Sequence, residues 1–224
     1  MDTSSARTID VISDVVCPWC YIGKRQLEEA IGRLPDAERP VVRWHPFQLN
    51  PDVPAEGLDR RRYLEEKFGG PERAAQIYQR VGAAGRTVGL ELAFDRIERQ
   101  PNTLDAHRLI AWAQSQPGAD AEPLVEALFR AYFIEGRLIG DRGELARIAG
   151  EAGFDVQAAR DWLDAERGTD EVAAMDREAR RMGIGGVPFF VFDGRIGVSG
   201  AAGADAIIDA MAQARAADPD APPG

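Results

Sequence analysis

The sequence has few of the residues that bind metals or cross-link chains, since only two of its 224 residues are cysteines and only two are histidines. A structural zinc site needs four ligands, but no second cysteine pair accompanies Cys17 and Cys20, and His45 and His107 lie far apart. We therefore predict no metal site. A permanent disulfide between the two cysteines would close so short a loop that it restrains little of the unfolded chain, so a structural cross-link is not expected either.

Long apolar runs and an excess of basic charge are also missing. No stretch approaches the length of a membrane span, and residues 1–7 lack a basic segment followed by an apolar one, so we expect a soluble, cytoplasmic protein with no membrane partner. The formal net charge is -10. A nucleic acid partner would need a basic face and is not expected. The reducing cytoplasm would keep a cysteine pair as the dithiol at rest.

The two cysteines stand where a predicted strand meets a predicted helix. Residues 7–16 are rich in β-branched residues, which is typical of a strand, and residues 21–31 carry apolar residues at helical spacing. Pro18 suits the first helical turn, because its missing N–H has no partner to lose. Cys17 would face the positive end of the helix dipole, which stabilises a thiolate over a thiol. We therefore predict redox chemistry, in which Cys17 attacks a substrate and Cys20, one turn inside the helix, resolves the mixed disulfide.

The rest of the chain predicts an α/β fold interrupted by helices. Residues 41–47 predict a second strand parallel to the first, with Cys17 at the carboxyl end of the sheet, where open α/β sheets carry their sites. Asp193-Gly194 predicts a tight hairpin between a buried strand at 187–192 and a partner at 195–199. The expected helices after the first are 58–68, 71–88, 103–114, 122–135, 142–152, 156–166, 169–182 and 204–217.

These segments follow the order β-α-β, then helices, then β-β-α, which is a thioredoxin fold with a large all-helical insertion. We expect residues 1–54 to form its first part and residues 169–217 its second part. Residues 55–168 would form the inserted helical subdomain, and residues 218–224 a disordered tail.

The residues also carry a resemblance. Cys17-Pro18-Trp19-Cys20 and the segment 186–192 resemble the DsbA family of thioredoxin-fold oxidoreductases, and more closely its cytoplasmic FrnE-like branch. The similarity extends over nearly the whole chain, through residues 21–25, 47–51, 102–109 and 198–201. It implies an enzyme, a thiol-disulfide oxidoreductase acting on disulfide- or thiol-containing proteins or small molecules. It also implies a cis peptide bond between Val187 and Pro188, whose backbone would bind a substrate segment opposite the cysteines.

Other residues near these motifs are candidates for substrate binding. Pro18 and Trp19 lie between the cysteines, and Trp19 is the expected exposed apolar contact. Asn102 either bonds substrate backbone or caps the helix that begins nearby. His107 either carries a proton at the site or packs as an ordinary histidine. No tightly bound cofactor is expected, although the helix start after residues 197–203 would suit a carboxylate such as that of glutathione, a candidate co-substrate.

Two other functions stay open. Hydroxychromene-carboxylate isomerases and kappa-class glutathione transferases resemble the chain in fold and helical insertion, but typically have serine at the position of Cys17 and no second cysteine. A redox-sensing binding module, whose insertion docks a partner when the disulfide forms, is the non-enzymatic alternative. Turnover of a disulfide substrate would distinguish an enzyme from such a sensor. The sequence makes no prediction of oligomeric state.

Overall fold

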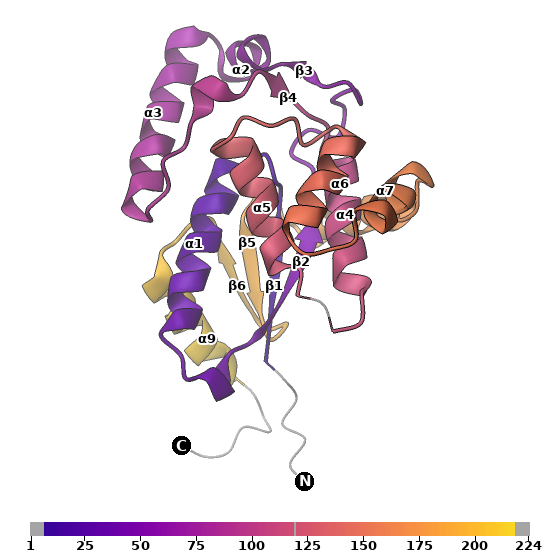
Figure 1. Cartoon of the computed structure of the whole chain (residues 1–224). Coiled ribbons are helices and arrows are strands. Elements are labelled where there is room, and N and C mark those ends of the chain that lie inside the picture. The colour runs from indigo at the N-terminus through magenta and orange to yellow at the C-terminus, as the bar shows by residue number, and fades with distance from the viewer. Residues whose placement is uncertain (1–6, 119, 218–224) are drawn as a thin grey trace.

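The structure, a computed structural model, describes residues 7–118 and 120–217 and is built on a four-stranded sheet in the order β2-β1-β5-β6 (Figure 1). The two central strands are β1 (Thr8–Ser13) and β5 (Phe189–Phe192), which pair antiparallel. The outer strands are β2 (Val41–Pro46), parallel to β1, and β6 (Ile196–Ser199), antiparallel to β5. The predicted α/β fold is confirmed, while the predicted tail at 218–224 lies outside the described residues.

Helices pack on both faces of the sheet. On one face, α1 (Pro18–Gly32) packs against α9 (Ala204–Ala216), and on the other, α8 (Thr169–Arg181) packs against β2. Because successive strand residues point to opposite faces, Val11 belongs to the large apolar cluster with α1 and Ile12 to a smaller cluster with α8. No helix among the described residues is both long and apolar enough to cross a membrane.

The described segment between β2 and α8 is rich in helices. Its helices are α2 (Arg60–Phe68), α3 (Pro71–Thr87), α4 (Leu104–Ser115), α5 (Glu122–Phe133), α6 (Arg142–Glu151) and α7 (Val156–Asp164). In Figure 1, α2 and α3 lie above the start of α1, and α5 lies beside α1. One continuous apolar cluster runs from the sheet through Tyr21 of α1 to Phe129 of α5, whose rings stack 5.0 Å apart. The insertion therefore shares its core with the sheet domain.

One predicted helix begins later than its sequence pattern suggests. Leu58 and Asp59, expected in a helix, form the short strand β3 (Leu58–Asp59), which pairs with β4 (Arg99–Gln100). Gly57 has φ 73° and lies so close to the Gln100 carbonyl that a Cβ atom would come within 2.7 Å of its oxygen. This turn feeds the chain into β3, and the Asp59 carboxylate then accepts a hydrogen bond from the Arg62 N–H at the start of α2.

The predicted hairpin after β5 is confirmed. Asp193 and Gly194 both have positive φ, 49° and 66°, as the tight primed turns between antiparallel strands require. The Asp193 carboxylate also accepts a hydrogen bond from the Thr8 N–H at 2.9 Å, which joins this turn to the start of β1.

A side chain covers part of the free edge of β2. The Gln114 amide of α4 accepts a hydrogen bond from the Trp44 N–H at 2.7 Å and donates one to the Trp44 carbonyl at 2.9 Å. These are the two backbone groups that a neighbouring strand would use. The contact fixes α4 against the sheet.

A buried ion cluster joins α1 to α5. The Lys24 side chain is 1% exposed, and its ammonium contacts the carboxylates of Glu28, Glu122 and Glu126, the last two at 2.6 and 2.8 Å. Burial alone would lower the pKa of Lys24, but these carboxylates, Glu122 first, raise it overall. The cation is therefore charged in the folded protein, and its removal would leave neighbouring carboxylates without their shared partner.

Lys24→Met should lower the free energy of unfolding by about 3 kcal/mol, the low end for breaking a buried ion pair, since the glutamates are partly exposed. Urea unfolding at neutral pH followed by circular dichroism measures it. Arg33→Met is the matched control, because Arg33 binds Glu29 and Asp205 on the surface, where ion pairs contribute little. Equal stability of the wild type and the Lys24 variant would contradict the ion cluster's role.

Candidate active site

Cys17 occupies the position at which β1 passes into α1. It is the N-cap residue of α1 with an extended backbone (φ -93°, ψ 113°), and Pro18 is the first helical residue. The Cys17 N–H donates to the Asp14 carbonyl at 2.9 Å, and the Cys17 carbonyl accepts from the Cys20 N–H at 3.0 Å. The predicted junction of strand and helix is therefore observed, with Cys17 at the end of α1 where unpaired N–H groups favour negative charge.

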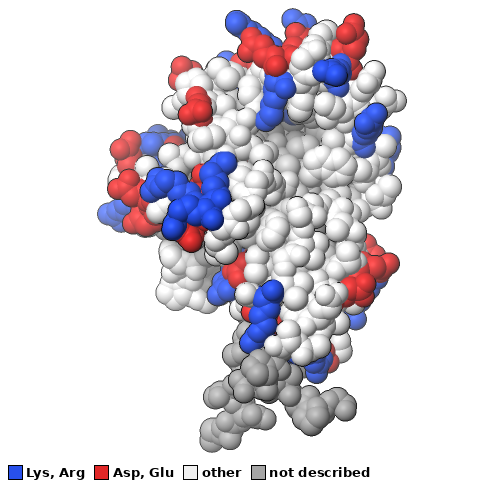
Figure 2. Space-filling view, turned by 180° about the vertical axis from the view of Figure 1, so that it is seen from behind, with Lys and Arg blue, Asp and Glu red and all other residues white. Residues whose placement is uncertain are grey.

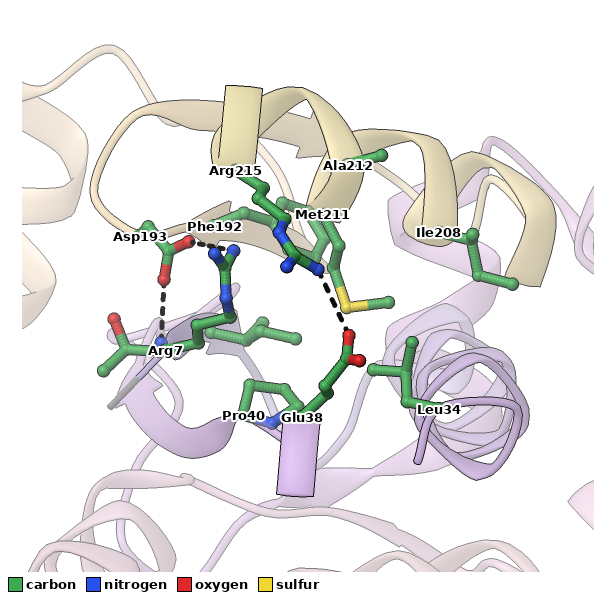
Figure 3. A pocket seen from close by; sticks show the side chains of 12 residues that line it. Arg7, Leu34, Glu38, Pro40, Phe192, Asp193, Ile208, Met211, Ala212 and Arg215 are labelled. Carbon is green, nitrogen blue, oxygen red and sulfur yellow. Dashed lines mark hydrogen bonds and ion pairs between the residues drawn. The ribbon is translucent and has the colours of Figure 1, made fainter. Parts of the chain in front are cut away.

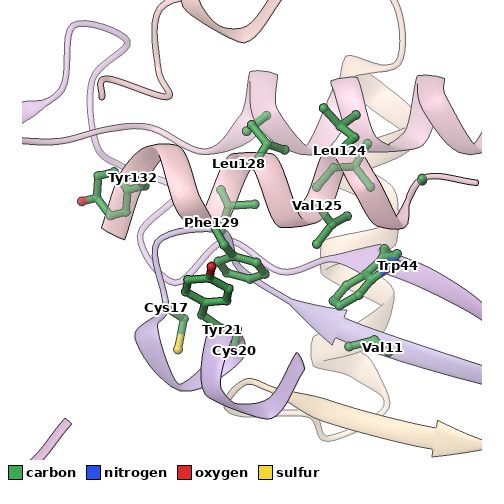
Figure 4. Close-up of a cluster of buried hydrophobic side chains, with 14 of the residues drawn as sticks. Val11, Cys17, Cys20, Tyr21, Trp44, Leu124, Val125, Leu128, Phe129 and Tyr132 are labelled. Carbon is green, nitrogen blue, oxygen red and sulfur yellow. The ribbon is translucent and has the colours of Figure 1, made fainter. Parts of the chain in front are cut away.

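The two sulfur atoms have different neighbours. The Cys17 thiol donates a hydrogen bond to the Val187 carbonyl across 3.6 Å, and the Val187–Pro188 peptide bond is cis. Figure 4 shows the Cys17 sulfur turned away from the apolar cluster. Cys17 is the more exposed of the two cysteines, but by a small margin: Cys17 is 5% exposed and Cys20 is 1% exposed. The carbonyl before Pro188 accounts for part of this cover.

Cys20 is the thiol that keeps its proton. Burial raises its pKa well above the ordinary value, and the hydrogen bond and charge of Cys17 raise it further. The Ser13 hydroxyl and the Asp14 backbone act in the opposite direction but are weaker. Loss of a proton from Cys17 therefore makes loss of a second proton from Cys20 harder.

A buried carboxylate lies directly behind the cysteines. Asp14 is fully buried, and its side chain accepts hydrogen bonds from the Leu49 N–H at 2.7 Å and from the Val16 N–H at 3.5 Å. His107 of α4 faces the same carboxylate, with its Nε2 atom 3.4 Å from Asp14 Oδ1. Asp14 was not among the predicted site residues, although an aspartate at the end of an apolar strand is a signal that could have identified it.

Helix α2 contributes polar side chains near the site. The Lys67 ammonium donates hydrogen bonds to Asn50 Oδ1 and to the Tyr63 hydroxyl, each at 2.9 Å. Burial lowers the pKa of Lys67, and the charges of Asp14 and Cys17 oppose this effect. Burial, with the Asp14 charge, raises the pKa of Tyr63 to about 12. Sequence reasoning missed both residues, because they lie in an insertion helix with no motif of its own.

Asn102 is partly buried just before α4, and His107 is buried within α4. The Asn102 side chain accepts a hydrogen bond from the Leu104 N–H at 2.9 Å and donates one to the Val53 carbonyl at 2.6 Å. Asn102 thus provides the acceptor for an N–H group at the start of α4, which agrees with its predicted capping role, while Thr103 provides no side-chain cap. His107 is buried beside Asp14. Their roles in substrate binding stay predictions.

Trp19 is the exposed member of the motif, with 40% of its surface accessible. An apolar ring at this exposure beside a reactive sulfur suits contact with another molecule. Figure 2, which views the face opposite to that of Figure 1, shows charged side chains gathered at the rim and a largely uncharged, hollowed centre. On that face basic and acidic side chains are mixed.

Other candidate sites lie away from the cysteines. A pocket of about 160 Å³ opens between α9 and the start of β1, near the ion pairs Arg7–Asp193 and Arg215–Glu38 (Figure 3). Its walls are mainly apolar, and it holds neither cysteine. Within residues 7–118 and 120–217, no cluster of three or more His, Cys, Asp or Glu side chains is arranged to hold a metal ion.

Comparison with known proteins identifies relatives over nearly the whole chain. The family model described as DSBA-like thioredoxin domain matches residues 8–212. YwbO of Bacillus subtilis (strain 168) is 30% identical over 199 residues, which is 88% of this chain and 92% of that protein. The crystal structure of a probable DsbA oxidoreductase, SCO1869 of Streptomyces coelicolor, is 32% identical and superimposes with a TM-score of 0.85 over 97% of this chain and 100% of that one.

A more distant structure shares the fold alone. The structure of a 2-hydroxychromene-2-carboxylate isomerase is 16% identical and superimposes with a TM-score of 0.68, covering 92% of this chain and 95% of that chain. This likeness shows that one fold carries different chemistries, so function has to be argued from the residues at the site.

The unequal environments of the sulfurs predict unequal reactivity. At neutral pH, brief treatment of the reduced protein with iodoacetamide should alkylate Cys17 at least about tenfold faster than Cys20, because the thiolate is the nucleophile and burial holds Cys20 as a thiol. Peptide mass spectrometry at successive times gives the two rates. In urea the difference should disappear, which is the control. Preferential alkylation of Cys20 in the folded protein would reverse the assignment.

Proposed function

Because the chain belongs to the family of DSBA-like thioredoxin domains, we propose that it is a thiol-disulfide oxidoreductase whose redox pair is Cys17 and Cys20. The observation that carries this proposal is the contrast between the two sulfurs. Cys17 lies at the helix N-terminus, turned away from the core, whereas Cys20 is buried one turn further on with a raised pKa. An attacking thiolate and a resolving thiol need this difference.

The reaction follows from the two positions. The Cys17 thiolate attacks one sulfur of a substrate disulfide, forming a mixed disulfide and releasing the other substrate sulfur as a thiolate. Cys20 then loses its proton and attacks Cys17, so that the Cys17–Cys20 disulfide forms and the second substrate thiolate leaves. The substrate gains two electrons and the protein loses two. The same steps in reverse oxidise a dithiol substrate.

The carbonyl of Val187 is the proposed anchor for a substrate backbone. It accepts a hydrogen bond from the Cys17 thiol in the reduced protein, and it loses this donor when Cys17 becomes a thiolate. A substrate N–H that donates to the same carbonyl would replace the lost bond and bring an extended segment alongside residues 187–188. Pro18 and Trp19 would flank that segment from the α1 side, where Trp19 is exposed.

The proposed substrates are proteins or small molecules that carry a thiol or a disulfide, with glutathione as a candidate co-substrate. The Lys67 ammonium, whose pKa responds to the charge of Cys17, offers a cation near the site for a substrate carboxylate. A cytoplasmic location and kinship with the FrnE-like branch complete the proposal. They are supported by residues 47–51 and 102–109, which carry that resemblance.

The isomerase and transferase alternative uses a single side chain at the helix start and needs no resolving thiol. Cys20 would then be dispensable. The buried position of Cys20 beneath the attacking residue favours the oxidoreductase, because an attack on Cys17 from this position needs no movement of a separate segment. A sensor would react once without turnover, which the same assay reveals.

Cys20→Ser should trap substrates as stable mixed disulfides on Cys17, because the resolving thiol is gone, whereas Cys17→Ser should form none and reduce no disulfide. Intact-mass spectrometry after incubation with oxidised glutathione measures the adducts, and a steady-state assay with glutathione and a disulfide substrate measures turnover. Ser115→Ala, away from the cysteines, serves as the control. Full turnover by the Cys20 variant would support the isomerase or transferase reading instead.

A further inference from the structure

A small cavity lies between the end of β1 and helix α4. Its volume is about 20 Å³, and it is lined by the side of the sheet at Ser13 and Trp44, and by His107 and Gln114 of α4. That volume is enough for one water molecule. Its walls are partly polar, and a buried water needs such groups as hydrogen-bonding partners.

Two polar atoms on this cavity are unsatisfied within the protein. Ser13 is 5% exposed and His107 is 4% exposed, and neither Ser13 Oγ nor His107 Nε2 makes a hydrogen bond to any group that the structure describes. A buried polar atom without a partner costs about 1–3 kcal/mol. Both atoms belong to residues that line one cavity with room for one water, so a single water that bonds to both would satisfy them.

The Ser13 hydroxyl also lies near the resolving thiol. It does not meet the geometry of a hydrogen bond to Cys20, yet its proximity lowers the pKa of that thiol against the larger effect of burial. Ser13 therefore stands between the Cys20 sulfur on one side and the cavity on the other. A hydroxyl can accept a proton from one group and donate its own to another, because its hydrogen rotates about the C–O bond.

His107 lies beside Asp14, a neighbour that suits a histidine acting as a proton acceptor. Its Nε2 atom faces Asp14 Oδ1 at 3.4 Å without a hydrogen bond. A neutral ring with an unprotonated Nε2 gains nothing from this carboxylate, but a ring protonated at Nε2 would form an ion pair with it.

We propose that Ser13, one water molecule in this cavity and His107 form a relay that removes the proton from Cys20 when Cys20 attacks the mixed disulfide. This inference rests on the proposed function of the Cys17–Cys20 pair. Ser13 takes the proton directly from the reacting thiol, and His107 is the final acceptor within the relay. Buried Cys20 has no direct access to solvent, so its proton must leave through the protein.

The step balances in atoms and electrons. The Cys20 thiol gives its proton to Ser13 Oγ while the serine hydroxyl proton passes to the water, and the water passes one proton to His107 Nε2. The Cys20 sulfur forms its bond to Cys17, the bond from Cys17 to the substrate sulfur breaks, and the substrate leaves with the electron pair as a thiolate. The His107 proton later returns to solvent past Met175, an exposed residue that lines the same cavity.

The two steps can be timed separately. The reduced protein is mixed in a stopped-flow instrument with an equimolar aromatic nitrobenzoate disulfide, whose coloured thiolate is released once when Cys17 attacks and again when Cys20 resolves. Ser13→Ala and His107→Gln should each slow the second release about a hundredfold, the low end of the range for lost acid–base assistance. The first release should stay within about twofold of the wild type.

Matched variants separate a relay from a packing effect. Ser13→Thr keeps a hydroxyl and should restore the second release, and the double variant should be no slower than the slower single one, because both groups serve one path. His45→Gln is the control, since His45 lines the same cavity but its Nε2 is bonded to Asp10 at 2.7 Å. It should leave both releases unchanged.

The outcomes are distinguishable. A second release at the wild-type rate in both Ser13→Ala and His107→Gln would overturn the relay, and so would equal slowing of both releases, which indicates a general packing role. A wild-type protein that releases no coloured thiolate at all would instead contradict the proposed oxidoreductase function. Slowing confined to the second release supports the relay.

Discussion

The fully buried carboxylate of Asp14 is the constraint on which the geometry of the site depends. The carboxylate accepts hydrogen bonds from the N–H of Leu49, just after β2, and from the N–H of Val16, just before Cys17. The backbone carbonyl of Asp14 accepts a hydrogen bond from the Cys17 N–H. A buried carboxylate without partners is very costly, so these bonds fix the exits of both parallel strands relative to one another. The position of the attacking sulfur follows from them, and α4 adds His107 on the remaining side.

The sheet and most helices could be predicted because each of these elements has a recognisable local sequence pattern. A run of β-branched residues indicated β1, a short apolar run indicated β5, and the Asp193-Gly194 turn indicated the hairpin to β6. The β3–β4 pair could not be predicted, because two residues are too short for a periodic signal and their pairing joins segments about forty residues apart in sequence. The core shared by the sheet and the insertion could not be predicted for a similar reason, because no local sequence pattern indicates that Phe129 stacks on Tyr21.

Some residues of the candidate site could likewise be predicted from the sequence, and others could not. The spacing of the cysteines at a predicted strand-to-helix junction singled out Cys17, Cys20 and Trp19, and the family resemblance singled out the Val187–Pro188 segment. Lys67 and Ser13 could not be singled out in this way, because only the fold brings them near the cysteines. Asn102 was correctly seen as a possible cap, but its bond to Val53 depends on a loop whose path no pattern describes.

The amide of Gln114 on the edge of β2 affects how the molecule meets other chains. An open sheet edge is a template on which extended segments of other chains can add and spread into aggregates. At Trp44 both backbone groups are already taken by one side chain, which cannot be extended by a further strand. This point of the sheet is thus closed to pairing with the edge strand of another molecule.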